Sequence, residues 1–251
     1  MDLGLGGAVA LVTGGVRGVG AGISRVLVEC GATVVACARH APDAPLDGVE
    51  FRECDVRDEA QVRAILGAVA DRYGRLDVVV NNAGGAPRAE AASASPRLHA
   101  KVVELNLLAP LLVAQVANAV MREQPNGGAI VMVSSISGHR PSPGTAAYGA
   151  AKAGLDNLVA TLAVEWAPKV RVNSVAAGMV RTEQAHLHYG DAAGVAAVGA
   201  TVPLGRLAEP EEVGRCVAFL ASPLASYVSG ATLTAHGGGE LPAFLSAARP
   251  S

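Results

Sequence analysis

The stretch that decides the fold is VALVTGGVRGVG, residues 9–20. The apolar run Val9–Thr13 predicts a buried strand, and the segment from Gly18 onward predicts a helix. Glycines at this junction let the backbone turn sharply, so that amide hydrogens and the positive end of the helix face a pyrophosphate. A tight turn alone would also use glycine, but the position directly after the first strand favours a dinucleotide site. The residues predicted to form it are Gly14, Arg17, Gly18, Val19 and Gly20.

Strands and helices alternate along the whole chain. The predicted strands are Val9–Thr13, Thr33–Cys37, Val49–Cys54, Leu76–Asn81, Ile130–Ser134, Val170–Val175 and Thr232–Thr234. The predicted helices are Gly18–Cys30, Asp58–Tyr73, Pro96–Arg122, Ala146–Trp166 and Pro210–Ala221. This alternation predicts an α/β fold, a Rossmann-type doubly wound parallel sheet of about seven strands with helices on both faces. No linker or change in composition divides residues 1–251, so we expect a single domain.

Two segments fit this alternation poorly. They are Gly84–Ser95, rich in Gly, Ala, Pro and Ser, and Thr182–Pro203. In a doubly wound fold, long irregular segments at the carboxyl ends of strands usually cover the ligand crevice. We therefore predict that both are lids, with residues 182–203 covering the substrate; the alternative is that both are surface excursions.

Composition excludes several classes of protein. The net charge is −2 and the basic residues are scattered, which argues against nucleic-acid binding. The chain is 51% hydrophobic, but Pro110 is expected to break its best apolar run, so no membrane span is predicted. The N-terminus lacks the cationic and continuous apolar segments of a secretory signal, which predicts a cytoplasmic protein.

The cysteines and histidines predict no metal site. Four cysteines, Cys30, Cys37, Cys54 and Cys216, are far apart in the sequence and include no CxxC pair, which favours buried reduced thiols. His186, His188 and Tyr189 lie in the second lid segment, where they could polarise a substrate or could be isolated surface side chains. No carboxylate is spaced to complete a metal site with them.

Tyr148 and Lys152 stand four residues apart in YGAAK, thirteen residues after Ser135. On a helix this spacing places the phenol and the ammonium on one face. We expect the cation to lower the phenol pKa from about 10, so that Tyr148 exchanges a proton near neutrality as a general acid or base. Ser135 ends a strand and is placed to hydrogen-bond a carbonyl oxygen as charge develops, whereas Ser134 would point to the opposite face.

Cofactor choice is usually decided at the end of the second strand, where a carboxylate would bind the ribose 2′-hydroxyl of NAD. Here that position reads Ala38-Arg39-His40, and Arg17 adds a second guanidinium in the glycine loop. The absence of a carboxylate and the presence of Arg39 predict NADP(H). NAD(H) is the alternative, if Arg39 stacks on the adenine or if both arginines are solvated surface charges.

With these residues assembled, the chain resembles the short-chain dehydrogenase/reductase family in its classical single-domain form, and within it the 3-oxoacyl reductases. The motifs that carry the resemblance are TGGVRGVG, Cys54-Asp55-Val56, NNAG at 81–84, Asn106, Ser135, Tyr148, Lys152 and LGRLAEPEEVGRCVAFLAS. The resemblance implies that Asp55, with Val56 beside it, binds the adenine amino group, and that Asn82, Ala83 and Gly84 line the adenosine. It also implies that Val180 and Thr182 hold the nicotinamide carboxamide.

The resemblance further implies the catalytic set. Lys152 would bind the nicotinamide ribose and hold Tyr148 ready, and Asn106 would anchor a water chain that leads from Lys152 to solvent. Two positions depart from the family pattern, because Ala177-Gly178 replaces the usual Pro-Gly and His236-Gly237-Gly238 replaces Asp-Gly-Gly. Neither departure removes a reacting group, although the first concerns the loop that carries Val180 and Thr182.

The expected reaction interconverts a ketone and a secondary alcohol by hydride transfer, with a 3-oxoacyl thioester among the candidate substrates. Carrier-protein reductases tend to present basic residues just before the fifth and the sixth strand, where this chain reads Pro125-Asn126-Gly127-Gly128 and Pro168-Lys169, which disfavours a carrier-protein partner. The remaining substrate pocket is expected from the lids and from His139, Arg140 and Pro141. An NAD-dependent alcohol dehydrogenase is the nearest alternative, and a non-enzymatic NADP(H) sensor or a scaffold is disfavoured by the intact catalytic set.

The chain is also predicted to form a homotetramer. Small residues on the helices Pro96–Arg122 and Ala146–Trp166 were expected at the surface, where they would let the helices of two subunits approach: Ala109, Ala114, Ala117, Ala151, Ala153 and Ala160. The apolar tail GGGELPAFLSAA is predicted to dock at a neighbouring subunit, because Leu241, Phe244 and Leu245 would otherwise be exposed.

Overall fold

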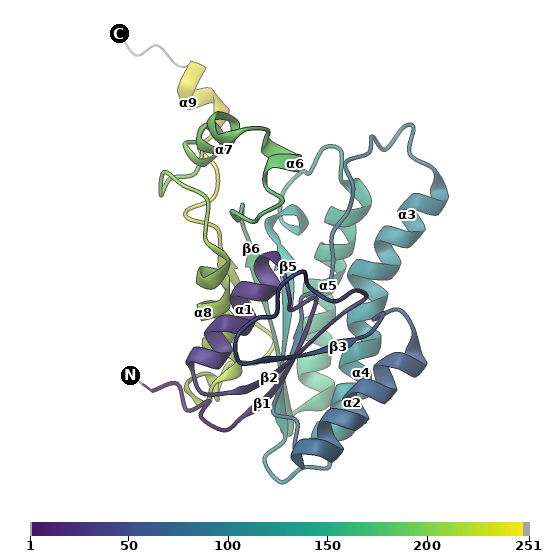
Figure 1. Cartoon of the computed structure of the whole chain (residues 1–251). Helices are drawn as coiled ribbons and strands as arrows, with labels where there is room; N and C mark the ends of the chain where they lie inside the picture. Colours follow the sequence, from purple (N-terminus) through teal and green to yellow (C-terminus); the bar gives the residue numbers. More distant parts are fainter. Residues whose placement is uncertain (1, 248–251) are drawn as a thin grey trace.

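The computed structural model describes residues 2–247, without the side chains of His188 and Ser246. Its centre is a parallel seven-stranded sheet in the order β3-β2-β1-β4-β5-β6-β7 (Figure 1). The strands are β1 Val9–Thr13, β2 Thr33–Ala38, β3 Val49–Glu53, β4 Val78–Asn81, β5 Gly128–Ser135, β6 Val170–Ala177 and β7 Thr232–Ala235. The predicted Rossmann-type doubly wound sheet of seven strands is therefore confirmed.

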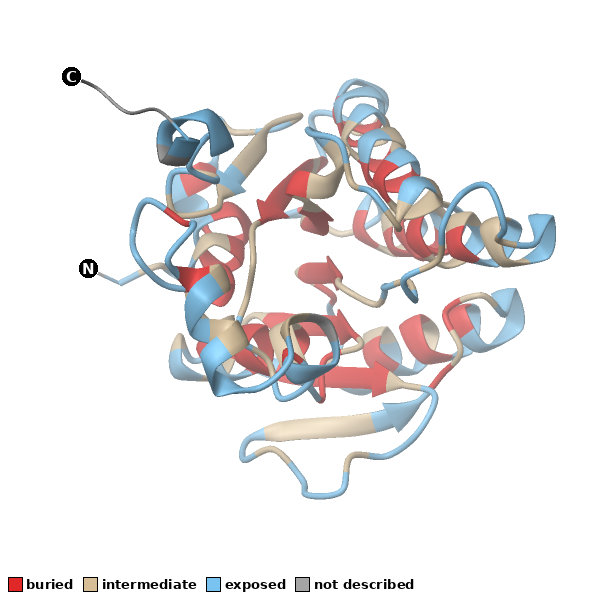
Figure 2. Ribbon diagram, turned by 90° about the horizontal axis from the view of Figure 1, so that it is seen from above, coloured by how far each residue is buried: buried red, intermediate tan, exposed pale blue. Residues whose placement is uncertain are grey.

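Two helix layers cover the sheet. On one face lie α1 (Gly18–Glu29) and α8 (Pro210–Ala221), and on the other lie α2 (Glu59–Tyr73), α4 (Ala109–Met121) and α5 (Ala146–Trp166) (Figure 1). Each layer forms its own hydrophobic core with the sheet. Figure 2 shows the buried strands between helices whose inner sides are buried and whose outer sides are exposed. Because both faces are covered, the central strands are mostly apolar, as Val78, Val79 and Val80 in β4 illustrate.

The strand order reverses between β1 and β4, which are direct neighbours in the sheet. The chain leaves β1 toward β2 on one side and leaves β4 toward β5 on the other. In this topology the crevice outside the carboxyl ends of the strands is the usual ligand site. The segments that follow β1 and β4 therefore border the predicted cofactor site.

The predicted helix Pro96–Arg122 is not one regular helix. It consists of α3 (Pro96–Val103), a π-helical segment η1 (Glu104–Leu108) and α4. Pro110 lies in the first turn of α4 and does not end the helical path, so the expected break there is wrong. By length and composition alone, residues 96–121 could cross a membrane, but a core helix passes the same test and 44% of the apolar window is buried inside the protein.

The other predicted ends agree within one or two residues, and Ala146–Trp166 and Pro210–Ala221 match exactly in both bounds. Residues 84–89 form no helix or strand, whereas the second lid segment holds two short helices, α6 (His186–Tyr189) and α7 (Ala192–Gly199). Short helical elements also occur at η2 (Ile136–Gly138), η3 (Pro223–Ala225) and α9 (Ala243–Ala247). The lid and the C-terminal segment lie together above the sheet in Figure 1.

Two expectations about packing need correction. Four of the six alanines assigned to the helix surfaces, Ala109, Ala114, Ala117 and Ala151, are buried within the chain, and only Ala153 and Ala160 are exposed. The Cys37 and Cys54 thiols are far apart in the sequence but lie next to each other in the fold. The hydrogen bond with Cys54, together with burial, raises the pKa of Cys37 well above its usual range. All four cysteines are free, and Cys30 and Cys216 are only half-buried.

Candidate active site

The glycine loop after β1 forms a cradle that only glycine can build. Gly14 and Gly18 adopt φ angles of 63° and 51°, in the left-handed region. A Cβ added to Gly20 would lie 2.1 Å from the Gly14 carbonyl oxygen, so a side chain there would clash with the loop itself. The backbone thus leaves an open, amide-lined concavity at the N-terminus of α1, which fits the phosphates of a dinucleotide.

Residues after β4 hold this cradle in place. The Thr13 hydroxyl accepts hydrogen bonds from the backbone amides of Asn82 and Ala83, each at 3.0 Å. In return, the Asn82 side-chain amide donates to the carbonyl oxygens of Thr13 and Gly14 at 3.0 and 3.1 Å. The two sides of the switch point are therefore held together, and Asn82 and Ala83 lie at the edge of the cradle.

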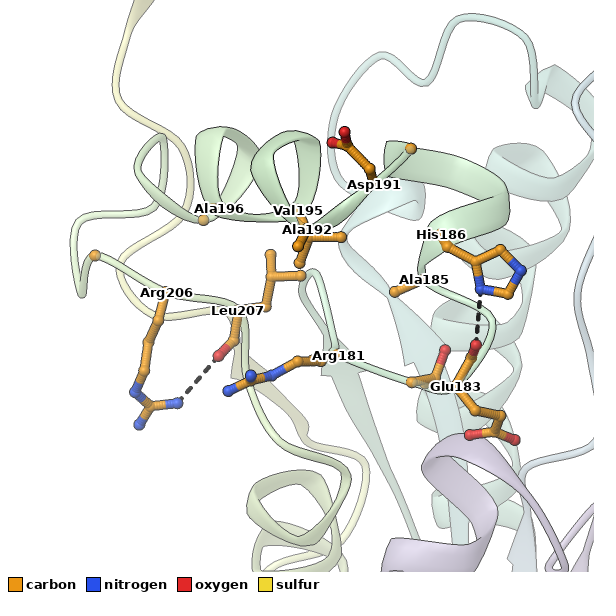
Figure 3. A pocket seen from close by; sticks show the side chains of 14 residues that line it. Arg181, Glu183, Ala185, His186, Asp191, Ala192, Val195, Ala196, Arg206 and Leu207 are labelled. Atoms are coloured by element: carbon orange, nitrogen blue, oxygen red, sulfur yellow. Dashed lines mark hydrogen bonds between the residues drawn. The ribbon is translucent and has the colours of Figure 1, made fainter.

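A carboxylate from the lid occupies the mouth of the cradle. The Gly18 amide donates to the two Glu183 oxygens at 2.9 and 3.2 Å. Figure 3 shows Glu183 reaching toward the N-terminus of α1. Thr182 stands directly over Gly18, since a Cβ on that glycine would lie 3.4 Å from the Thr182 methyl group. Arg17, the N-cap residue of α1, is exposed.

The opposite end of the predicted cofactor site, beyond β2 and β3, is basic. Arg39 is exposed at the end of β2, and Val56 is buried. The Asp55 carboxylate pairs with Arg57, which donates from Nε at 2.9 Å and from Nη2 at 2.6 Å. These hydrogen bonds lower the Asp55 pKa, and the Arg39 charge contributes in the same direction. Sequence reasoning missed Arg57, although the spacing Asp-x-Arg was visible.

Ser135 and Tyr148 come together at the carboxyl end of β5. Ser135 caps η2, where its hydroxyl accepts from the Ser137 amide at 3.2 Å. Burial raises the Tyr148 pKa, a hydrogen bond with Ser135 lowers it, and the neighbouring Tyr189 raises it. The expectation that Lys152 brings the phenol pKa toward neutrality is therefore wrong for this state, in which desolvation prevails.

Lys152 lies one helical turn beyond Tyr148, but its ammonium group donates a hydrogen bond to the backbone and not to the phenol. Its Nζ donates to the Val133 carbonyl oxygen at 2.7 Å and lies 5.6 Å from the centre of the Tyr148 ring. Burial lowers the Lys152 pKa to about 8, against the opposing charge of Asp156. An ammonium with a pKa so close to neutrality can release its proton readily.

Asn106 lies in the π-helical segment and is completely buried. Its Oδ1 accepts from the Gly85 amide at 2.8 Å, and its Nδ2 donates to the carbonyl oxygens of Gly85 and Val102 at 2.9 and 2.8 Å. A Cβ on Gly84 would lie 2.7 Å from Asn106 Oδ1 and 3.5 Å from Lys152 Nζ. The π segment thus brings Asn106, Gly84 and Lys152 to one place.

A partly buried carboxylate, which sequence reasoning missed, lies behind the catalytic strand. Asp156 accepts from the hydroxyls of Ser134 and Ser174, each at 2.9 Å, and its Oδ2 lies 2.8 Å from His139 Nε2. Ser134 therefore points away from Ser135, as predicted. The signal available in the sequence was an aspartate four residues after Lys152, on the same helix face.

The segment after β6 carries the last predicted cofactor residues. Val180 forms an isolated bridge with Ala208. Ala177, which replaces the usual proline, pairs with Ala235 of β7, and the Gly178 amide donates to the Ala235 carbonyl at 2.9 Å. The non-standard residues are thus accommodated by regular pairing. A Cβ on Gly178 would lie 2.8 Å from the Cα of His236, so the two departures from the family pattern touch each other.

A cavity of about 560 Å³ opens beneath the lid, lined by α6, α7 and residues 205–207 (Figure 3). It borders Thr182 and Glu183 at the cofactor end and does not include Ser135, Tyr148 or Lys152. Its arginines are already paired, Arg181 with Glu209 and Arg206 with Glu212. Within residues 2–247, no three His, Cys, Asp or Glu side chains gather into a possible metal site.

A family model described as enoyl-(acyl carrier protein) reductase matches residues 14–240, which include the cradle and the catalytic residues. This chain is a short-chain dehydrogenase/reductase. It is 41% identical to a cis-4-hydroxycyclohexanecarboxylate dehydrogenase of Sinomonas cyclohexanicum, over 92% of this chain and 95% of the relative. It is 35% identical to a 3-oxoacyl-[acyl-carrier-protein] reductase of Vibrio cholerae, over 92% and 97%.

Among solved structures, the ligand-free aldohexose dehydrogenase of Thermoplasma acidophilum superposes with a TM-score of 0.88 at 29% identity. The superposition covers 98% of this chain and 97% of that one. These short-chain dehydrogenase/reductases carry different substrate names on the same fold. The family membership therefore establishes an oxidoreductase that uses a nicotinamide cofactor, and the substrate must be argued from the site.

Proposed function

We propose that the protein is an NADP(H)-dependent oxidoreductase that interconverts a ketone and a secondary alcohol, with Tyr148 as the general acid and base. The observation that carries the proposal is the placement of Ser135 at the end of β5, where it lowers the pKa of Tyr148, with Tyr148 and Lys152 one turn apart on α5. A bound nicotinamide would supply or accept the hydride. Gly14, Gly18 and Gly20 would hold its phosphates, and Lys152 the adjoining ribose.

In the reduction direction, the two hydroxyls meet the substrate carbonyl oxygen. Ser135 donates a hydrogen bond that stabilises the charge developing on that oxygen, and Tyr148 delivers the proton. Burial keeps Tyr148 protonated before the reaction, which suits a general acid. Lys152, whose pKa is about 8, then returns a proton toward the phenol, and Asn106 fixes the backbone of Gly85 beside this route.

The mechanism is tested by Tyr148→Phe, which removes only the hydroxyl. We expect turnover to fall by about a hundredfold or more, while the dissociation constant of the cofactor stays near its original value. Steady-state kinetics with a panel of ketones, together with calorimetric titration of the cofactor, measure both quantities. Near-normal turnover in this variant would remove Tyr148 from the mechanism.

The preference for NADP(H) is supported by the basic character of the adenosine end. No carboxylate follows β2, and within residues 2–247 neither Arg17 nor Arg39 forms an ion pair. One charge-assisted hydrogen bond to a 2′-phosphate contributes about 1.5–3 kcal/mol, equal to a tenfold or larger preference. Calorimetry should show tighter binding of NADPH than of NADH, and the double change Arg17→Ala with Arg39→Ala should remove most of the difference.

A sharper test adds Ala38→Asp to that double variant. The new carboxylate should accept hydrogen bonds from the ribose hydroxyls of NADH and repel the 2′-phosphate of NADPH, so the variant should bind NADH more tightly than NADPH. Equal affinity of the unmodified protein for NADH and NADPH would instead favour an NAD-dependent alcohol dehydrogenase. A non-enzymatic sensor would bind either cofactor but reduce no ketone.

Two further features belong to this proposal. We place the enzyme in the cytoplasm, since all four cysteines are free thiols. We also propose a homotetramer, with Ala153 and Ala160 on the exposed side of α5 as part of one contact.

A small ketone or a coenzyme A thioester is preferred as substrate over a carrier-protein thioester. Residues 125–128 and 168–169 contain a single basic side chain, Lys169, and its Nζ is bonded to backbone carbonyls.

A further inference from the structure

Arg140 stands on the loop that joins the two catalytic elements. The loop leaves β5 at Ser135 and enters α5 at Ala146, two residues before Tyr148. The Arg140 amide donates to the Ile136 carbonyl at 3.1 Å, so the backbone at this position is fixed directly to the residue after Ser135. A side chain at Arg140 is therefore held at a set position relative to the reacting hydroxyls.

The guanidinium of Arg140 already binds a carboxylate. Its Nη2 donates to Glu240 Oε1 at 2.5 Å across 100 residues of sequence, and its Nη1 donates to the Pro141 carbonyl at 2.8 Å. The two charged side chains are 37% and 35% exposed. An ion pair that is exposed to water to this degree contributes at most about 1 kcal/mol. Another carboxylate can therefore replace Glu240.

Glu240 follows a glycine turn that places it beside the end of the lid. The turn consists of Gly237, Gly238 and Gly239, which adopt φ angles of 65°, 95° and 94°. Three successive glycines give the backbone freedom that other residues lack. The next amide, that of Leu241, donates to the Thr201 carbonyl at 2.8 Å, so Glu240 is attached to the end of the lid.

The ion pair and the reacting phenol flank the same lid side chain. Burial raises the pKa of Tyr189, while the Arg140 charge lowers it and the Glu240 charge raises it. Tyr189 in turn raises the pKa of Tyr148. These mutual influences agree with the geometry of the loop, in which the Arg140 amide is bonded to the residue that follows Ser135. His139, the other basic side chain of the loop, is bound to Asp156 and does not compete for this role.

We propose that Arg140 is a specificity-determining residue that binds a carboxylate of the substrate, so that the ketone reduced at Tyr148 is an oxo acid. This inference rests on the proposed function and names its substrate class. The substrate carboxylate replaces Glu240 on the guanidinium, where the planar fork accepts both carboxylate oxygens and Glu240 supplies one. Displacement of Glu240 frees the segment that is bonded to Thr201, so acid binding and lid position are coupled.

The test compares acids with esters of the same shape. The probes are 4-oxocyclohexanecarboxylate and 4-oxopentanoate, each beside its methyl ester, assayed with NADPH and with NADH. We expect the unmodified enzyme to favour each acid by about tenfold or more in kcat/KM, the value of one charge-assisted hydrogen bond. In Arg140→Gln the ratio should fall to about one, mainly through KM of the acids, while the esters change by less than about threefold.

Two variants sharpen the test. Arg140→Lys keeps the charge without the fork and should retain part of the preference, and Glu240→Gln should lower KM for the acids several-fold and leave the esters unchanged. Arg25→Gln is the matched control, because Arg25 forms a comparable exposed ion pair with Glu211 on the other side of the fold. The inference is overturned if Arg140→Gln leaves the acid-to-ester ratio unchanged, or if the unmodified enzyme favours the esters.

Failure of the proposed function gives a different result. If no ketone is reduced with either cofactor, the redox assignment fails, and calorimetric titration of the two acids decides the inference alone. Acid binding that is lost in Arg140→Gln and kept in Arg25→Gln supports the carboxylate site. No binding to the unmodified protein, or equal binding to both variants, overturns it.

Discussion

Lys152 is only 3% exposed, and burial lowers the pKa of its ammonium group from 10.5 to about 8. This difference corresponds to about 3 kcal/mol of lost stability when the group is protonated. Below pH 8 both the folded and the unfolded chain hold the proton, so the cost is complete. Between pH 8 and 10.5 the unfolded chain binds more protons, so stability rises with pH. Function at this position is therefore opposed to stability.

Lys152→Met should separate the two effects. We expect the free energy of unfolding at pH 7 to increase by about 2 kcal/mol, since the Val133 carbonyl loses its donor at a cost of about 1 kcal/mol. The gain should shrink as the pH is raised from 8 to 10.5, and turnover should disappear. Urea unfolding at pH 7 and pH 10 measures the change. A gain that is equal at both pH values would contradict the origin assigned to it.

Glu183 places a negative charge where a dinucleotide would place its phosphates. It binds the Gly18 amide at 2.9 Å, so it must leave before a phosphate can use that amide. Glu183→Gln removes the repulsion and keeps the shape of the side chain. We expect the cofactor dissociation constant to fall by about threefold to tenfold, measured by calorimetry, with Glu211→Gln as a control on the exposed surface. Weaker binding in Glu183→Gln would mean that the carboxylate assists the cofactor.

At the scale of elements, the parts of the fold that local pattern determines were predictable. The helix Ala146–Trp166 and the strand Val9–Thr13 are long or strongly apolar, and their bounds agree with the structure. The π segment was not predictable, because it forms around the contact of Asn106 with Gly85, 21 residues away. The lid helix Ala192–Gly199 is short and built from Ala, Val and Gly, a composition that decides little by itself.

The same division holds for the site. Ser135, Tyr148 and Lys152 lie on regular elements, so their sequence spacing fixes their arrangement in space. The charged partners Arg57, Asp156 and Glu183 were missed, because each acts through a side-chain direction or a contact between distant segments. The wrong expectation for the Tyr148 pKa has a similar cause. Spacing places the cation near the phenol, but burial, which raises the Tyr148 pKa, depends on the packing around the site.

The π segment provides the prediction at this scale. Asn106→Ala removes the bonds of this side chain to the N–H and C=O of Gly85 and to the C=O of Val102, each of which contributes about 1 kcal/mol, and it leaves a cavity in the buried π segment. The free energy of unfolding should fall by about 2–4 kcal/mol, and kcat/KM should fall with it. The Gly85 amide should exchange with solvent much faster by hydrogen exchange. Asn157→Ala, at an exposed position on α5, is the control; if the two variants unfold alike, Asn106 does not organise this segment.

At the scale of the whole molecule, the surface carries more apolar area than a monomer needs. Val164 on α5 and Tyr227 before β7 are 80% and 104% exposed. These side chains are candidates for subunit contacts in the predicted homotetramer. The buried alanines of α4 do not contribute, since they pack against the sheet. Exposed large side chains, and not closely packed alanines, are therefore the candidate subunit contacts.

The C-terminal tail gives the last prediction. Leu241, Phe244 and Leu245 are 52%, 68% and 54% exposed in the single chain, and the Leu241 amide is bonded to the Thr201 carbonyl of the lid. If the tail docks on a neighbouring subunit, it ties assembly to the position of the lid. Deletion from residue 241 onward should then reduce the particle mass in light scattering at micromolar concentration and raise KM, because the lid loses its anchor.

Phe244→Ser with Leu245→Ser tests the tail without shortening it. This double change keeps the Leu241 amide and its bond to Thr201, so it should weaken assembly while the local attachment of the lid remains. Loss of assembly with unchanged KM would assign the apolar side chains to the subunit contact and the Leu241 bond to the lid. A monodisperse monomer formed by the unmodified protein would contradict the homotetramer, and the exposed tail would then need a different partner.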